Sequence, residues 1–287
     1  MLSRLGRLLA GRCFPHPIFV TGPSRAGTSV LLQALGKHPL IRSMQGEAPF
    51  LTSIGGATWL FHFGDNRDYY RGSLRYSERY LHDTLRRVGF EYAAGPHYGL
   101  GSTLRALARL DLSILRKRFW CAKTFPDEKV CRGLCRLYPS VKFICILRNG
   151  CDVVHSMSRY GGFRGSSFEE LCSRWSRSVG KYALFSRLEC AVQVRHESMV
   201  SRPDAFFSEI FDFLDIERDE GPVRFVRSTL VHPLDEPGRS GVDTRRLFRE
   251  RPPSYELWSP EQQATFRRVC GEKMAEDGHE MTLSPTH

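Results

Sequence analysis

IFVTGPSRAGTSVLLQAL, residues 18–35, is the most informative segment of this chain. An apolar run at 18–22 predicts a buried strand, and residues 29–35 repeat apolar side chains at helical spacing. Two glycines, Gly22 and Gly27, bracket four residues between these elements. This order predicts a phosphate-binding loop, because glycines permit tight turns while backbone N–H groups and the positive end of the helix dipole attract an oxyanion.

The loop differs from that of nucleoside triphosphatases in the identity and position of its positively charged side chain. Thr28 follows the second glycine, where those enzymes place a lysine that reaches the terminal phosphates. The loop instead carries Arg25, and the strongest predicted strand, 141–147, ends at Arg148 rather than at an aspartate able to hold magnesium. We therefore expect a ligand held by arginines, hydroxyls and main-chain amides, with no metal ligands in the site.

Strands and helices alternate along the rest of the chain. Apolar runs predict strands at 119–122, 141–147 and 191–195, and helical patterns predict helices at 128–138, 153–160, 203–214 and 261–274. This alternation predicts a single α/β domain over 1–287, with a mainly parallel central sheet flanked by helices, similar to P-loop NTPases. In such sheets ligands bind beyond the carboxyl ends of the strands. Residues 59–118 predict a helical insertion, and residues 1–15 a basic amphipathic segment.

The composition of the chain indicates which kinds of binding partner and which cellular location to expect. Lysine and arginine total 42 against 31 acidic residues, and the net charge of +11 favours anionic partners: nucleotides, sulfated or phosphorylated substrates, nucleic acid or an acidic membrane. Nine cysteines lack metal-ligand spacing, and several lie in apolar runs, which favours a reduced protein. No apolar stretch approaches the ~20 residues that span a bilayer. We expect a cytoplasmic protein without a transmembrane segment.

Several motifs resemble the sulfotransferase family, in particular its tyrosylprotein and bacterial-type members. The family's first nucleotide-binding loop reads Arg-Ser-Gly-Thr-Ser, followed by two leucines and His-Pro. The matching motifs here are RAGTS at 25–29, LL at 31–32, HP at 38–39, KT at 123–124 with Pro126, residues 139–156, and RHE at 195–197. The resemblance covers 17–50 and 119–216. It departs at Ala26, His196 and Ser198, where serine, tyrosine and aspartate are usual.

The resemblance implies transfer of a sulfuryl group from 3'-phosphoadenosine 5'-phosphosulfate (PAPS) to a hydroxyl or amine. The residues that it assigns to the nucleotide are Ser24, Arg25, Ala26, Gly27, Thr28, Ser29, Arg148, Ser156, His196, Arg239 and Ser240. Arg148 and Ser156 would bind the 3'-phosphate. Lys123 and Arg25 would stabilise the leaving phosphate. Glu47 would be the base, with His62, His97 and His155 as alternatives.

Two other functions stay open at this point. A kinase with a degenerate loop would need magnesium and an acceptor hydroxyl, and the absent lysine argues against it. A basic nucleic-acid-binding protein would fit the charge, but the chain has no recognised nucleic-acid motif. The acceptor would be a small molecule, a glycan or a peptide. Tyrosines and arginines in 59–118 favour an anionic acceptor, although a solvated helical face explains them almost as well.

Overall fold

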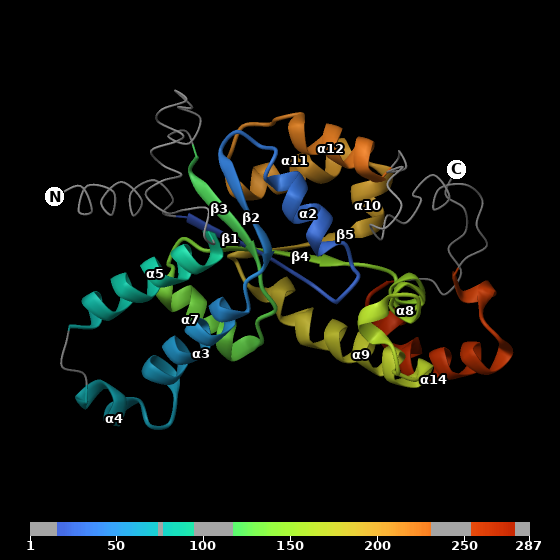
Figure 1. The fold of residues 1–287 in the computed structure, drawn as a ribbon, viewed down its shortest axis with the longest axis horizontal. Helices are drawn as coiled ribbons and strands as arrows, with labels where there is room; N and C mark the ends of the chain where they lie inside the picture. Colours follow the sequence, from blue (N-terminus) through green and yellow to red (C-terminus); the bar gives the residue numbers. More distant parts are fainter. Residues whose placement is uncertain (1–15, 74–76, 95–116, 231–253, 279–287) are drawn as a thin grey trace. The chain divides into compact units, whose positions relative to one another are not determined.

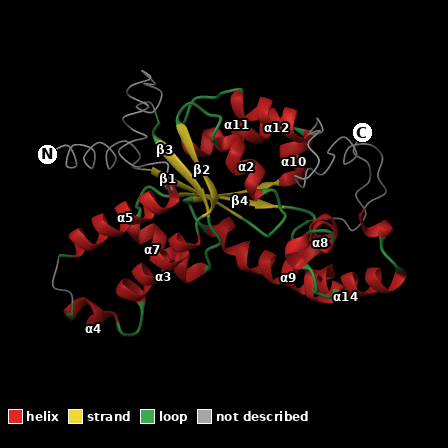
Figure 2. Cartoon of the chain, viewed as in Figure 1, coloured by secondary structure: helices red, strands yellow, loops and turns green. Residues whose placement is uncertain are grey.

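A computed structural model describes residues 16–73, 77–94, 117–230 and 254–278. It confirms an α/β fold with a parallel five-stranded sheet flanked by helices (Figure 1, Figure 2). The strands are β1 (His16–Thr21), β2 (Ile41–Glu47), β3 (Phe119–Lys123), β4 (Lys142–Leu147) and β5 (Ala191–Arg195). Their order in the sheet is β2-β3-β1-β4-β5, so β2 and β5 form the edges.

Pairing with β3 places the carboxyl ends of β1 and β2 next to the carboxyl end of β3. β1 and β2 both run parallel to β3, and Val20 and Glu47 are each paired with Lys123. A bulge lies in β2 between Ser43 and Glu47, where Gly46 takes a φ of 82°. Because glycine has no Cβ, it adopts this left-handed conformation at little cost. Glu47 therefore ends β2 beside the end of β3.

Packing divides the chain into two compact units, and each is described by itself. The first contains β1 to β3 and the helices α3 (Pro49–Phe63), α4 (Arg67–Gly72), α5 (Glu78–Ala94) and α7 (Glu128–Leu137). α3 packs against α7, and α5 contacts both helices (Figure 1). Asp127 begins α7 by accepting a hydrogen bond from the backbone N–H of Val130. The predicted insertion is helical over its described part, whereas residues 95–116 lie outside the described residues.

The second unit contains the glycine loop and a helical layer. Its helices are α8 (Gly150–Ser158), α9 (Phe168–Tyr182), α10 (His196–Ser201), α11 (Pro203–Leu214), α12 (Gly221–Leu230) and α14 (Pro260–Glu276), with short 3-10 turns η3 (Gly161–Phe163), η4 (Ala183–Arg187) and η5 (Ser254–Leu257). α8, α9 and α14 pack around a core that includes Trp175, Trp258 and Phe266. Capping boxes at Ser167 and Ser259 begin α9 and α14. This core fixes α8, which follows β4 directly.

The elements α2 (Thr28–Leu35), β4 and β5 pass from one unit to the other. All four strands and all five helices predicted from the sequence are present, with bounds that differ by a few residues. β2, α9, α10 and α12 were not predicted, and neither was the part of α3 before residue 59. The single domain over 1–287 stays a prediction, and the segment 1–15 lies outside the described residues. No described helix is long and apolar enough to cross a membrane.

Candidate functional site

The glycine loop lies between the end of β1 at Thr21 and the start of α2 at Thr28. Gly22 and Gly27 take φ values of 147° and 100°, in the region that favours glycine. A Cβ on Gly27 would lie 2.5 Å from Cδ2 of His196, so the absence of a side chain lets the loop approach α10 closely. Thr28 is buried at the first turn of α2, and Ser24 and Ser29 are exposed.

Arg25 is the loop's cation, and its backbone conformation and two side-chain contacts define its place. Its backbone takes a left-handed φ of 68°, which is uncommon for a residue with a side chain. Nε donates a hydrogen bond to the Ser156 hydroxyl at 3.1 Å, and the guanidinium lies 4.4 Å from the ring centroid of Tyr160. Ser156 lies on α8 and Tyr160 just after it. The side chain of Arg25 is therefore directed toward the C-terminal half of α8.

Arg148, the residue after β4, is largely buried with 15% of its side chain exposed. Nη1 donates to the backbone oxygen of Arg25 at 3.3 Å, and Nη2 lies 3.5 Å from Oδ2 of Asp152. Its Nε is buried and has no hydrogen-bond partner among the described residues. A buried donor without a partner is costly, and a phosphate oxygen would satisfy it. Arg148 therefore fits an anionic ligand.

Hydrogen bonds hold the residues around Arg148 in place. The Asn149 side chain caps α8 by accepting from the N–H of Cys151, while the Asn149 N–H donates to Oε1 of Glu197 at 2.8 Å. Burial, with the nearby Arg148 cation, lowers the pKa of His196 well below its usual value. The imidazole next to Gly27 is therefore neutral near pH 7, and it can accept or donate one hydrogen bond toward a nucleotide.

A cavity of about 240 Å³ opens beside the loop at Ser24. Its lining includes Met157 and Phe163, and three cationic side chains, Arg174, Arg177 and Lys181, come from α9. Sequence reasoning missed these cations because α9 was not predicted, although the spacing of 174, 177 and 181 is that of one helix face. An anionic group would be attracted to this cavity by their charge.

Lys123 and Glu47 form a second group at the carboxyl ends of β3 and β2. Nζ of Lys123 lies 3.0 Å from Oε1 of Glu47. Only 10% of the lysine side chain is exposed, whereas 59% of the glutamate side chain is exposed. The backbone N–H of Ala48 donates to the Lys123 carbonyl at 2.9 Å, and the Thr52 and Thr124 hydroxyls lie 3.1 Å apart. The pair is thus positioned by the two strands themselves.

The predicted site residues fall into two described groups. Arg25, Arg148 and Ser156 are joined by direct hydrogen bonds, and His196 contacts their loop at Gly27. Lys123 and Glu47 form the other group, in the first unit. Arg239, Ser240 and the alternative base His97 lie outside the described residues. Of the other alternative bases, His62 lies on α3 and His155 on α8.

Two members of the first group were not singled out from the sequence. Tyr160 lies under the Arg25 guanidinium, and Asp152 pairs with Arg148. The spacing of Arg148 and Asp152, four residues apart, is a helical ion-pair signal that the sequence does contain. Tyr160 has no such signal, because its contact depends on the left-handed turn at Arg25.

The sulfotransferase family matches residues 17–220 of this chain. A protein of Caenorhabditis briggsae assigned as a protein-tyrosine sulfotransferase is 26% identical over 211 residues, which are 71% of this chain and 67% of that protein. Protein-tyrosine sulfotransferase 1 of Danio rerio is 24% identical over 212 residues, which are 69% of this chain and 53% of that protein.

Among solved structures, mouse sulfotransferase SULT7A1 complexed with PAP shares the fold, with a TM-score of 0.50 and 15% identity over 95% of this chain and 90% of the mouse protein. The family match extends over more than half of the chain and includes both groups of site residues. The chain belongs to the sulfotransferase family, and it is a transferase enzyme of that class.

Proposed function

We propose that this protein transfers a sulfuryl group from PAPS to a hydroxyl or amine of an acceptor. The observation that carries the proposal is the linkage of Arg25, Arg148 and Ser156 at a glycine loop. Two guanidinium groups and a hydroxyl that meet beside the backbone of a glycine loop suit a ligand with several phosphate charges. The PAP bound to the mouse sulfotransferase supports the same class of nucleotide.

The nucleotide would be held by the second unit. Arg148 offers its unpartnered Nε, and Ser156, whose oxygen accepts from Arg25, keeps its own proton for a phosphate oxygen. The loop amides with Arg25, Thr28 and Ser29 would hold the 5'-phosphate. Binding would therefore rest on hydrogen bonds and charge from the chain's own residues. PAPS itself supplies the activated sulfuryl group, and the leaving group of the transfer is the 5'-phosphate of PAP.

Lys123 and Glu47 would act on the reacting groups. A buried lysine can neutralise negative charge that develops on the leaving phosphate, and a carboxylate can accept the acceptor's proton. Their 3.0 Å contact leaves two roles for Glu47: it accepts the proton, or it orients the Lys123 ammonium. We propose the base role, because 59% of the Glu47 side chain is exposed and can be reached by an acceptor.

The acceptor would be a small molecule, a glycan or a peptide that approaches the helical segment after β2. Exposed aromatic side chains on α4 and α5, Tyr69, Tyr70 and Tyr80, offer contact area. The arginines of these helices are largely paired with acids of the first unit, such as Arg71 with Glu78 and Arg79 with Asp83. Much of the positive charge is therefore neutralised locally. An anionic acceptor stays a prediction with less support than the sequence alone suggested.

A cytoplasmic location is the further part of this proposal. The eight described cysteines form no disulfide with one another, and six of them are buried. Reduced thiols are typical of proteins that stay in the cytosol, where glutathione and thioredoxin keep disulfides rare. Localisation of the full chain with a small C-terminal tag, followed by microscopy, tests this part. A signal confined to a secretory compartment would contradict it.

Ligand-dependent thermal stability tests the nucleotide assignment. At a concentration 100 times its Kd, a ligand that binds only the folded state adds about 2.7 kcal/mol, which corresponds to a Tm shift of about 4 to 5 °C for a chain of this size. We expect PAP to produce this shift in the presence of EDTA, and ATP with magnesium to produce little. A shift with ATP and magnesium but none with PAP would exclude the proposal and favour the kinase alternative.

A further inference from the structure

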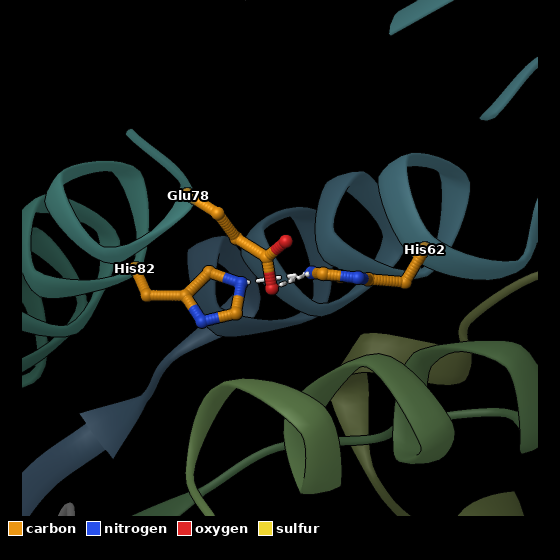
Figure 3. A group of neighbouring side chains, drawn as sticks. All are labelled: His62, Glu78 and His82. Atoms are coloured by element: carbon orange, nitrogen blue, oxygen red, sulfur yellow. Dashed lines mark hydrogen bonds and ion pairs between the residues drawn. The ribbon is translucent and has the colours of Figure 1, made fainter. Parts of the chain in front are cut away.

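Two helices of the first unit bring three metal-ligating side chains together. His62 lies near the C-terminal end of α3, and Glu78 and His82 lie four residues apart on α5. One ligand atom from each residue lies within 4.8 Å of the other two. Figure 3 shows the three side chains directed toward one another from the two helices. None of the three is among the residues assigned to the nucleotide.

We propose that His62, Glu78 and His82 bind a divalent transition-metal ion of the zinc class, which bridges α3 and α5. Two imidazole nitrogens and one carboxylate oxygen are the donors of three-coordinate protein zinc sites, and a water would complete the tetrahedron. Imidazole selects zinc, cobalt, nickel or copper over magnesium and calcium, which prefer oxygen ligands. The donor set therefore favours a transition metal over magnesium or calcium at this site.

The distances between the donor atoms are close to those of a filled site. Nε2 of His62 lies 2.8 Å from Nε2 of His82 and 3.8 Å from Oε1 of Glu78. In a tetrahedral zinc site with bonds of about 2.0–2.1 Å, donor atoms are about 3.3 Å apart. Each of the two contacts thus needs to change by about 0.5 Å, which side-chain rotation alone can supply. The donor atoms of the third pair, Glu78 and His82, lie within 4.8 Å of each other.

A histidine binds a metal ion through a ring nitrogen that carries no proton. Each ring would therefore carry its proton on Nδ1 and offer the Nε2 lone pair. The metal would replace the hydrogen bond that now joins the two Nε2 atoms.

Two arginines compete with a metal for Glu78. Arg136 lies 2.8 Å from Oε1 and Arg71 lies 3.4 Å from Oε2 of this carboxylate. About half of each arginine side chain is exposed. Exposed ion pairs contribute about 1 kcal/mol or less each, so releasing one of them costs little. The other arginine can remain on the second oxygen and orient the carboxylate.

Metal binding by the tag-free, chelator-treated protein tests the proposal. Titration with ZnCl2 in a calorimeter should give one equivalent of bound zinc. The double variant His62→Gln, His82→Gln loses two of the three ligands and should show no measurable zinc binding at this site, and the single variant Glu78→Gln should bind zinc at least about 10-fold more weakly. The matched controls are Asp83→Asn, an exposed carboxylate on the same helix, and His16→Gln, a histidine on β1. Both controls should keep the wild-type affinity.

Cobalt spectroscopy separates this site from the cysteines of the chain. Co2+ bound by imidazole and carboxylate should show visible ligand-field bands of a tetrahedral site, without the intense near-ultraviolet band of a cobalt–thiolate bond. These bands should disappear in the double histidine variant and persist in Asp83→Asn. A thiolate band, or equal metal binding by wild type and the double variant, would overturn the proposal. Circular dichroism of each metal-free variant verifies that it is folded.

Discussion

Arg25 and Ser156 are joined by a 3.1 Å hydrogen bond although 131 positions separate them in the sequence. This bond connects the glycine loop with α8, and Arg148 reinforces it by donating to the Arg25 carbonyl. Had Arg25 and Arg148 pointed in unrelated directions, the proposed nucleotide site would have had no basis. Their convergence supports a phosphate-binding site in which guanidinium groups, a hydroxyl and backbone amides are the donors.

Removal of Arg148 should weaken nucleotide binding selectively. Hydrogen bonds to charged groups contribute about 1.5–3 kcal/mol, so Arg148→Ala should raise the Kd for PAP about 10- to 100-fold. Ser156→Ala should have a smaller effect of about 5-fold, because its hydroxyl is neutral. Calorimetric titration with PAP measures both. Arg159→Ala, an exposed arginine at the end of α8, is the control. Tight PAP binding by Arg148→Ala would refute the pocket assignment.

Replacement of Glu47 should separate turnover from nucleotide binding. If Glu47 is the base, Glu47→Gln should lower kcat about 10²- to 10⁴-fold, while the Kd for PAP stays unchanged. Transfer of radiolabelled sulfuryl groups to acceptor pools measures the turnover, with the exposed Glu128→Gln as the control. Because glutamine can still hydrogen-bond to Lys123, a variant that keeps most of its turnover would show that Glu47 orients the lysine instead.

A methyl group at Gly27 should disrupt the loop through contact as well as strain. The new Cβ in Gly27→Ala would lie 2.5 Å from the His196 ring, and the residue would keep a φ near 100°. Gly165→Ala matches the strain without the contact, since its φ is 86° and nothing lies within 4 Å of the added Cβ. We expect Gly165→Ala to lose about 1–2 kcal/mol of unfolding free energy and Gly27→Ala to lose more, because the contact with His196 adds to the strain. Only Gly27→Ala should also lose PAP binding in a thermal-shift assay.

The stability of the nucleotide-free protein should fall on the acid side of neutrality, partly through His196. Its folded-state pKa is lowered, whereas the unfolded chain titrates near 6.5. The unfolded state therefore binds more protons below pH 6.5, and stability decreases as pH falls. From pH 7.5 to 5.5 this histidine should account for up to about 1.4 kcal/mol. Urea unfolding of wild type and His196→Gln in EDTA should show a shallower pH dependence for the variant, and parallel curves would contradict the assignment.

The sequence predicted the strands that carry continuous apolar runs and the helices with a clear apolar face. It missed β2, because this edge strand contains Arg42, Ser43 and Gly46 and lacks the pattern of a buried strand. Glu47 was singled out by resemblance alone, and its position opposite Lys123 came from the strand register. α9 was missed although a serine cap begins it, and with it the cations Arg174 and Arg177.

Contacts that depend on three-dimensional convergence could not be read from spacing. His62 stood alone in the sequence, and a solitary histidine is most often structural. The structure places it 2.8 Å from His82, 20 positions away, because α3 and α5 pack together. Glu78 and His82 did share a helix face, which was the one part of this cluster that periodicity could have indicated.

Because of the bulge in β2, the position of Glu47 opposite Lys123 does not depend on regular strand pairing of the residues just before it. β2 advances four residues, from Ser43 to Glu47, while β3 advances two, from Cys121 to Lys123. Since pairing resumes at Glu47, the intervening turn can change its composition without moving the acid away from its lysine partner. A one-residue deletion there would instead bring a neighbouring side chain opposite the lysine. A change of composition in the bulge is thus compatible with an unchanged contact between Glu47 and Lys123.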